Sequence, residues 1–146
     1  MASNEFIFYE GPIECAIFLD IDGVLNRHYD SSSTPDVIKM FGKFLNIRLI
    51  DALNKLTDET GAVIVISSSW RRKDFCTASI LRKAGVTGQI AGETPMLDGY
   101  NVRGNEILAW IKENISRLGV SNYSDFKQYL ILDDSDDMLL WQANHL

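Results

Sequence analysis

The stretch AIFLDIDGVLN, residues 16–26, joins an apolar run to two aspartates and a glycine. Its first four residues are continuously apolar, which is typical of a strand that is buried on both faces of a sheet. Asp20 and Asp22 come at the end of this strand, and Gly23 follows directly. Because a buried carboxylate is costly without a partner, we expect other groups at this strand end to compensate the two charges.

Three further apolar runs predict the other strands of the sheet, at residues 62–66 and 129–132 and, more weakly, at residues 88–92. Apolar side chains recur at helical spacing in the segments between the strands, residues 47–56, 74–85 and 104–119. Asp74 is a candidate cap for the second of these helices. The alternating order predicts an α/β fold in which a doubly wound parallel sheet lies between two layers of helices.

Length and composition favour a single domain over residues 1–146. The formal net charge of −6 argues against nonspecific binding to nucleic acids or anionic membranes. We expect no signal peptide and no membrane span, because the N-terminus lacks a basic segment and no apolar run is long enough. Cys15 and Cys76 form no CxxC pair, so we expect a reduced, cytoplasmic protein.

Polar side chains follow each of the three main predicted strands. After the first strand come Asp20, Asp22 and Gly23; after the second come Ser67, Ser68, Ser69, Trp70 and Arg71; after the last come Asp133, Asp134, Asp136 and Asp137. Ligand sites in open parallel sheets lie beyond the carboxyl ends of the strands. We therefore expect these acidic and hydroxyl groups to gather at one edge of the sheet.

Grouped carboxylates repel one another, and a hard divalent cation removes this conflict. Mg²⁺ prefers a few carboxylates and keeps positions for water and phosphate oxygens. One carboxylate could attack phosphorus while its neighbour transfers the proton. Ser67 or Ser68 could hold the other phosphate oxygens, and Arg103 is the first candidate for the balancing cation, with Lys73 and Lys127 as alternatives.

Each feature alone also has a plain structural interpretation. A DxDG sequence is often only a turn, SSSW often caps a helix, and acidic runs often occupy a helix N-terminus. Arg103 could be an ordinary surface charge. The occurrence of all these features in this order, at the ends of predicted parallel strands, favours a functional site.

These motifs resemble the haloacid dehalogenase (HAD) superfamily of phosphatases and phosphotransferases. FLDIDGVLN is similar to its first motif, VIVISSS to its second and YLILDDSDD to its fourth, while Arg103 stands where the basic third motif is expected. DIDGVLN, SSSWR, GETP, RGNEILAWI and LILDDSDDM together resemble the HAD domain of Swiss Army Knife RNA repair proteins. The resemblance covers most of the chain and implies a HAD-like Rossmannoid fold.

The resemblance also implies roles for individual residues. Asp20 would be the nucleophile and a Mg²⁺ ligand, and Asp22 would be the general acid/base and would bind Mg²⁺ through its backbone carbonyl. Asp133 would be a further Mg²⁺ ligand, assisted by Asp134 or Asp137. The remaining assignments are Gly23, Ser69 and Arg71 near the substrate, where Arg71 either contacts substrate or braces the acidic cluster. Trp70 is expected to serve in packing.

Substrate choice in this superfamily often depends on an inserted cap domain. Residues 27–46 are too few for such a domain and are expected to form a short flap. A minimal cap, or none, implies an open site for phosphorylated small molecules, nucleic-acid ends or phosphoproteins. Relatives usually continue with another strand after the fourth motif, and this edge strand is either absent or cut from the chain.

The sequence therefore predicts a Mg²⁺-dependent phosphohydrolase that forms an aspartyl-phosphate. A non-catalytic regulatory or interaction module on the same scaffold is the alternative. A phosphoacceptor receiver domain also uses a doubly wound sheet, but its acceptor follows a middle strand, where this chain has serines. The substrate and the oligomeric state stay open.

Overall fold

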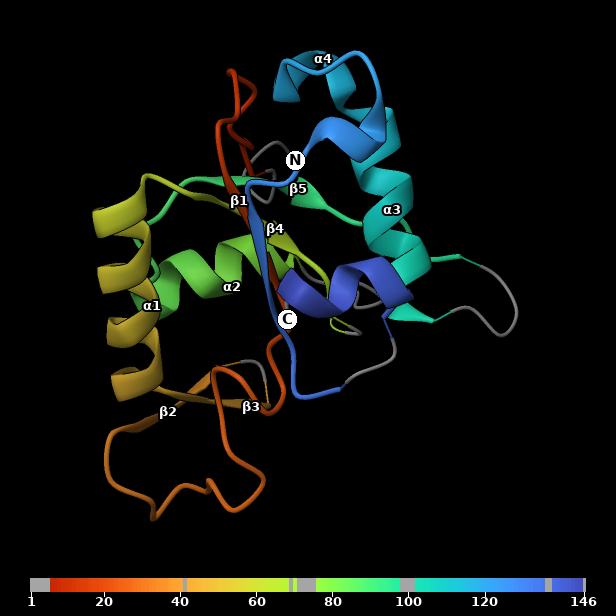
Figure 1. Cartoon of the computed structure of the whole chain (residues 1–146). Helices are drawn as coiled ribbons and strands as arrows, with labels where there is room; N and C mark the ends of the chain where they lie inside the picture. The colour runs from red at the N-terminus through yellow and green to blue at the C-terminus, as the bar shows by residue number, and fades with distance from the viewer. Residues whose placement is uncertain are drawn as a thin grey trace.

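A parallel sheet forms the centre of the computed structural model, which describes residues 6–40, 42–68, 70, 76–97, 102–135 and 138–145. Within these residues the sheet has four strands in the order β5-β4-β1-β6 (Figure 1). The strands are β1 (Ala16–Leu19), β4 (Val63–Ile66), β5 (Ile90–Glu93) and β6 (Tyr129–Leu132). All three neighbouring pairs are parallel, as the sequence predicts.

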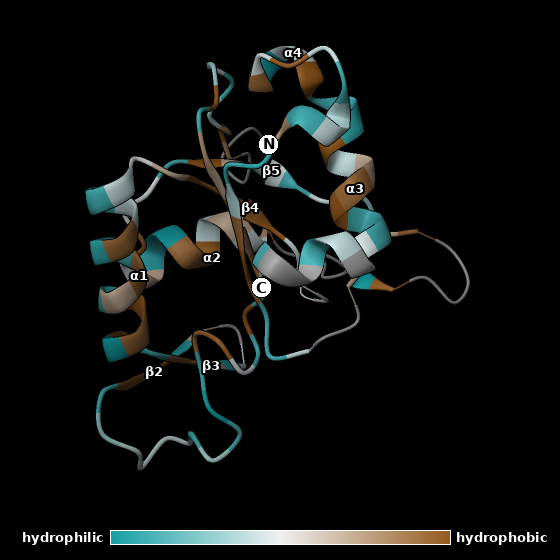
Figure 2. Cartoon of the chain, viewed as in Figure 1, coloured by the Kyte–Doolittle hydropathy of each residue, from teal (hydrophilic) through white to brown (hydrophobic). Residues whose placement is uncertain are grey.

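Two hydrophobic clusters cover the two faces of the sheet. On one face, Ile17 and Ile64 pack with residues of α1 (Ile47–Thr60) and α2 (Thr77–Ala84). On the other face, Phe18 and Val65 pack with residues of α3 (Arg103–Glu113). Figure 2 shows hydrophobic residues along β4 and hydrophobic bands on α1 and α3. Because successive residues of a strand point to opposite faces of the sheet, an unbroken apolar strand supplies side chains to both clusters. The predicted three-layer α/β fold is confirmed.

The helices follow the predicted pattern with two differences. α1 begins after its Asn46 cap and ends at Gly61, whose φ of 69° is left-handed. α2 begins after Cys76, so the prediction of an Asp74 cap was wrong, and Asp74 itself lies outside the described residues. The last predicted helix is interrupted at Asn114, which separates α3 from α4 (Ile115–Leu118). No helix among the described residues combines the length and apolar character needed to cross a bilayer.

An antiparallel hairpin follows the first strand of the sheet. It consists of β2 (Val37–Met40) and β3 (Lys43–Asn46) and lies within the segment predicted as a short flap. The hairpin is attached to the chain after β1, because the Asn46 N–H donates to the Leu25 carbonyl at 2.8 Å. Figure 1 shows it beyond one end of the sheet, next to the loop that leaves β1.

The chain after β6 does not form another strand within the described residues. The short helix η3 (Tyr123–Asp125) precedes β6, and the helix η4 (Leu140–His145) follows it. The Gln142 side chain is fully buried and donates to the Gly104 carbonyl at 3.0 Å. This contact attaches η4 to the first turn of α3.

Candidate active site

Three strands deliver polar residues to the same edge of the sheet. Asp20 follows β1, Ser67 follows β4, and Asp133 follows β6. The Asp20 N–H donates to the Leu132 carbonyl and the Ser67 N–H donates to the Leu19 carbonyl, each at 2.8 Å. These bonds extend the strand ladders by one residue and therefore place the backbones of Asp20 and Ser67 within the ordered sheet.

The carboxylates of Asp20, Asp133 and Asp134 lie together, with one oxygen of each within 4.8 Å of the others. Arg103, the first residue of α3, lies against this group and is 20% exposed. Its Nη1 is 3.3 Å from Asp20 Oδ1 and 3.1 Å from Asp133 Oδ2, and it also donates to the Ser67 carbonyl. One guanidinium therefore contacts groups from the ends of three neighbouring strands.

Burial dominates the electrostatics of Asp20. Only 9% of its side chain is exposed, and this desolvation raises its pKa above the ordinary value. The Ile21 N–H and Arg103 oppose the shift, whereas the charge of Asp134 adds to it. Three carboxylates and one guanidinium leave two negative charges in this group, which matches the charge of a divalent cation.

Gly23 lies against Asp134 of the acidic group. Its φ of +84° is in the left-handed region, and a Cβ at this position would overlap the carboxylate of Asp134. Its N–H donates to Asn26 Oδ1 at 3.0 Å. The position therefore requires glycine both for the turn and for the close approach of Asp134.

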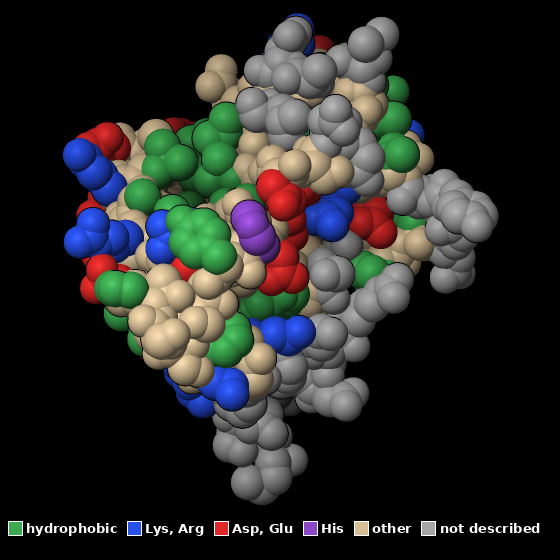
Figure 3. Space-filling model, turned by 90° about the horizontal axis from the view of Figure 1, so that it is seen from below, with side chains coloured by type: hydrophobic (Ala, Val, Ile, Leu, Met, Phe, Trp, Pro, Cys, Tyr) green, Lys and Arg blue, Asp and Glu red, His purple; other side chains and the backbone are tan. Residues whose placement is uncertain are grey.

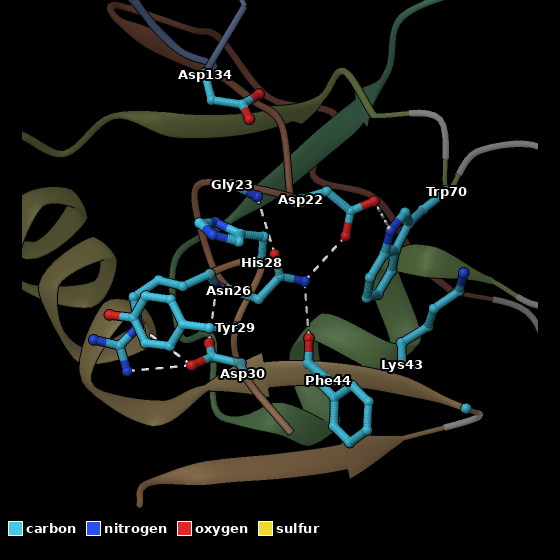
Figure 4. A pocket seen from close by; sticks show the side chains of 12 residues that line it. Asp22, Gly23, Asn26, His28, Tyr29, Asp30, Lys43, Phe44, Trp70 and Asp134 are labelled. Atoms are coloured by element: carbon cyan, nitrogen blue, oxygen red, sulfur yellow. Dashed lines mark hydrogen bonds and ion pairs between the residues drawn. The ribbon is translucent and has the colours of Figure 1, made fainter. Parts of the chain in front are cut away.

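The Asp22 carboxylate does not belong to the group of three carboxylates. Its Oδ2 accepts a hydrogen bond from Trp70 Nε1 at 3.0 Å, and its Oδ1 accepts one from Asn26 Nδ2 at 3.0 Å. Asn26 Nδ2 also donates to the Phe44 carbonyl in β3 at 2.9 Å. The Asp22 carboxylate is thus oriented by side chains from two different segments (Figure 4). Its predicted contact with Mg²⁺ through the backbone carbonyl stays a prediction.

The two candidate phosphate-binding serines have different surroundings. Ser68 is fully buried, and its Oγ accepts from the Trp70 N–H at 3.2 Å. Ser67 is 1% exposed, and its Oγ has no hydrogen-bond partner among the described residues. A buried hydroxyl without a partner is unfavourable by about 1–3 kcal/mol. Of the two serine hydroxyls, Ser67 Oγ is therefore the one that is available for a further hydrogen bond.

The sequence matches the family model for the HAD domain in Swiss Army Knife RNA repair proteins over residues 16–146. The chain belongs to this family. The predicted resemblance is confirmed, and membership indicates a phosphohydrolase of the HAD type in general terms. No curated protein and no solved structure matches the chain.

The HAD domain has a pocket beside Asp22 with a volume of about 680 Å³. Its wall combines groups from the loop after β1, the β2–β3 hairpin and the segments that follow β4 and β6: Asp22, Gly23, Asn26, Arg27, His28, Tyr29, Asp30, Gly42, Lys43, Phe44, Trp70 and Asp134. We call it the hairpin pocket. Figure 3 shows acidic, basic and histidine side chains gathered on this face of the domain.

Several predicted residues cannot be compared with this geometry. Ser69, Arg71, Lys73 and Asp137 lie outside the described residues, so their predicted roles stay predictions. Lys127 precedes β6 and is therefore at the opposite end of that strand from Asp133. Of the two basic candidates that the structure describes, Arg103 is the one that contacts the acidic group.

Sequence reasoning missed two groups of the site. Trp70 is 1% exposed, as expected for packing, but its indole also donates to Asp22 across 48 residues of sequence. Asn26 was not considered, although it lies within the quoted stretch and bonds Gly23, Asp22 and Phe44. The available signal was that Asn26 follows Asp22 by four residues in a turn that contains Gly23.

Proposed function

We propose that this HAD domain is a Mg²⁺-dependent phosphomonoesterase that acts through an aspartyl-phosphate on Asp20. The observation that supports it most strongly is the buried Asp20 carboxylate, which is 3.3 Å from Arg103 and is grouped with two further carboxylates. Family membership supports the same general chemistry. The alternative is a non-catalytic module on this scaffold.

Asp20 is the proposed nucleophile. Its carboxylate oxygen attacks phosphorus and forms an acyl phosphate while the bond from phosphorus to the leaving oxygen breaks. Arg103 holds Asp20 Oδ1 at 3.3 Å, so the carboxylate is fixed before the substrate arrives. Burial removes water that would otherwise solvate and weaken this nucleophile.

Asp22 is the proposed general acid and base. In its protonated form it gives the proton to the leaving oxygen, and as a carboxylate it then takes a proton from the water that attacks phosphorus. This second attack breaks the acyl phosphate, releases inorganic phosphate and restores the Asp20 carboxylate. Trp70 and Asn26 support this role because they hold both Asp22 oxygens.

The donor set is suited to Mg²⁺, which binds oxygen ligands. Asp20, Asp133 and Asp134 would hold the ion, with the Asp22 backbone carbonyl as the further ligand that the family resemblance implies. Bound Mg²⁺ would neutralise charge on the phosphoryl group and on these carboxylates. The two surplus negative charges and the raised pKa of Asp20 both support a cation at this position.

Ser67 is the proposed phosphate-binding hydroxyl, with Ser68 as the alternative. The choice depends on Ser67 Oγ, which has no hydrogen-bond partner in the described part of the chain, whereas Ser68 Oγ accepts from the Trp70 N–H. The Ser67 carbonyl also accepts from Arg103, which fixes the backbone at this point. Gly23 supports Asp134 and shapes the turn beside the phosphate.

The hairpin β2–β3 is small, so the proposed site stays open to phosphomonoesters of varied size. Nucleic-acid ends belong to this range, and the name of the matching family refers to RNA repair. The net charge of −6 means that binding to a long polyanion would depend on local basic groups. We also propose a cytoplasmic location, in keeping with the two free cysteines.

The test is hydrolysis of a generic phosphomonoester by the wild-type protein and by Asp20→Asn, with Mg²⁺ and with EDTA. We expect Mg²⁺-dependent turnover that Asp20→Asn abolishes, while Asp51→Asn, an exposed acid on α1, keeps full activity. Full activity in folded Asp20→Asn would disprove the nucleophile assignment. Absence of turnover on a broad phosphate panel, together with tight binding to a protein partner, would favour the non-catalytic alternative.

A further inference from the structure

We infer that the hairpin pocket is a subsite for a leaving group that carries a flat aromatic ring. The inference deepens the proposed function and rests on it. It concerns which phosphomonoesters the site prefers. The position of the pocket and the chemistry of its wall both support it.

The position follows from Asp22. This residue lines the hairpin pocket, and in the proposed reaction it gives a proton to the leaving oxygen. The leaving oxygen must therefore come within hydrogen-bond distance of Asp22, at the border between the acidic group and the pocket. Asp134 marks the same border, because it belongs to the acidic group and also lines the pocket. The body of the leaving group then extends into the pocket.

The wall of the pocket offers an aromatic platform. Tyr29 lines the pocket and is 59% exposed, so its ring is accessible to a ligand. The His28 ring meets it edge to face, with ring centroids 5.5 Å apart and an interplanar angle of 85°. Figure 4 shows His28 and Tyr29 on one side of the pocket, and Trp70 and Lys43 on the other.

The platform is held in place before any ligand binds. The Arg27 guanidinium lies over the Tyr29 ring, 4.7 Å from its centroid, and helps to orient it. Arg27 is paired in turn with Asp30, whose side chain is fully buried. The backbone N–H of Arg27 donates to Asp30 Oδ2 at 2.8 Å. The side-chain amide of Asn46, at the end of β3, donates to the same oxygen at 3.5 Å.

This arrangement favours a flat ring over an aliphatic group or a sugar. A planar π system can stack on the exposed Tyr29 ring, and the nearby cations Arg27 and Lys43 attract electron-rich faces. A volume of about 680 Å³ is much larger than a phosphate and accepts a ring together with its linker. A nucleobase and a phenyl ring share this chemistry, and the experiment separates them.

The experiment uses two matched pairs of substrates with the Mg²⁺-loaded protein. Adenosine 5′-monophosphate is compared with ribose 5-phosphate, and 2-phenylethyl phosphate with butyl phosphate. In each pair the leaving oxygen belongs to a primary alcohol, so intrinsic reactivity is similar and the ring is the main difference. We expect kcat/KM to be roughly 5- to 100-fold higher for the member with the ring, the range that aromatic stacking gives.

Three variants test whether the preference depends on the aromatic ring of Tyr29. Tyr29→Ala should remove most of the preference, and Tyr29→Phe should keep it because the ring is retained. Tyr123→Ala is the matched control: this exposed tyrosine also has a cation, Lys112, at 4.7 Å from its ring, but it does not line the hairpin pocket. Melting temperatures confirm that each variant is folded.

The outcomes separate the inference from the proposed function. Preference in both pairs supports a subsite for any flat ring, and preference in the nucleotide pair alone supports one for a nucleobase. Equal kcat/KM values in both pairs, or a preference that survives in folded Tyr29→Ala, would overturn the inference while the phosphatase stands. If no substrate turns over, the proposed function fails. Equilibrium binding of adenosine 5′-monophosphate and of ribose 5-phosphate then tests whether the pocket binds a flat ring. Equal affinities for the two compounds would overturn the inference.

Discussion

The indole of Trp70 donates a hydrogen bond to Asp22 Oδ2 at 3.0 Å. Trp70 is 1% exposed and belongs to the core cluster that covers one face of the sheet. One end of this side chain therefore packs in the core while the other orients the proposed general acid. The amide of Asn26 holds the second oxygen of the same carboxylate.

Replacement of Trp70 by Phe keeps an aromatic side chain but removes the indole donor. We expect kcat to fall roughly ten-fold with little change in KM, because proton transfer depends on the orientation of Asp22. The matched control is Trp110→Phe, which loses similar volume from the core on the other face and does not contact Asp22. Steady-state kinetics check the prediction, and equal kcat values for the two variants would contradict it.

Asp20→Asn should stabilise the protein near neutral pH in the presence of EDTA. The pKa of Asp20 is raised above its ordinary value of 3.8, chiefly by burial, so the folded state binds this proton more tightly than the unfolded state does. The free energy of unfolding of the wild type therefore decreases as pH rises from about 3.8 through the folded pKa. The Asn variant lacks this decrease.

Urea denaturation at a series of pH values measures this difference. We expect the midpoint of Asp20→Asn to exceed that of the wild type at pH 7, and the advantage to disappear as pH falls toward the ordinary carboxyl pKa. A variant that is less stable than the wild type at pH 7 would show that the ion pair with Arg103 outweighs the cost of burial.

Mg²⁺ should raise the melting temperature of the wild type. A ligand that binds only the folded state adds about 2.7 kcal/mol to the free energy of unfolding at one hundred times its Kd. Asp134→Asn should lose most of this increase because it removes one of the three grouped carboxylates. Asp51→Asn is the control, and NaCl of equal ionic strength tests for general screening. An undiminished Mg²⁺ shift in Asp134→Asn would exclude this residue as a ligand.

Gly104→Ala should destabilise the domain by about 1–3 kcal/mol, the usual cost of an overpacked site. Alanine normally favours a helix, but a Cβ here would overlap Gln142 Oε1 and lie 2.6 Å from Leu139 N. The buried contact between α3 and η4 would have to open. Ser116→Ala, at an exposed position of α4, is the control and should change the urea midpoint little.

The sheet and the acidic group could be predicted because their signals are local. β1, β4 and β6 are unbroken apolar runs, and each is followed directly by the polar residues that the parallel sheet brings to one edge. Arg103 could be proposed from its place at the start of a helix, and it contacts Asp20 and Asp133. Fold class and family were therefore accessible from the sequence.

The remaining features depend on contacts between distant segments. The β2–β3 hairpin has only four residues in each strand and includes polar Lys39 and Lys43, so its pattern resembles a loop. The bond from Trp70 to Asp22 spans 48 residues, and no spacing rule predicts it. The break at Asn114 is the exception, because its side-chain amide donates to the Trp110 carbonyl only four residues earlier. Tertiary packing decides the other two features.

Arg103 has a consequence for how the domain would lose function on heating. Because it contacts Asp20, Asp133 and the Ser67 carbonyl, it links the ends of β1, β6 and β4 to the first turn of α3. We expect the contacts of Arg103 to be lost together with the sheet whose strand ends they join. The chemistry of the site and its scaffold should disappear along one cooperative curve, so residual activity would serve as a direct readout of the folded fraction.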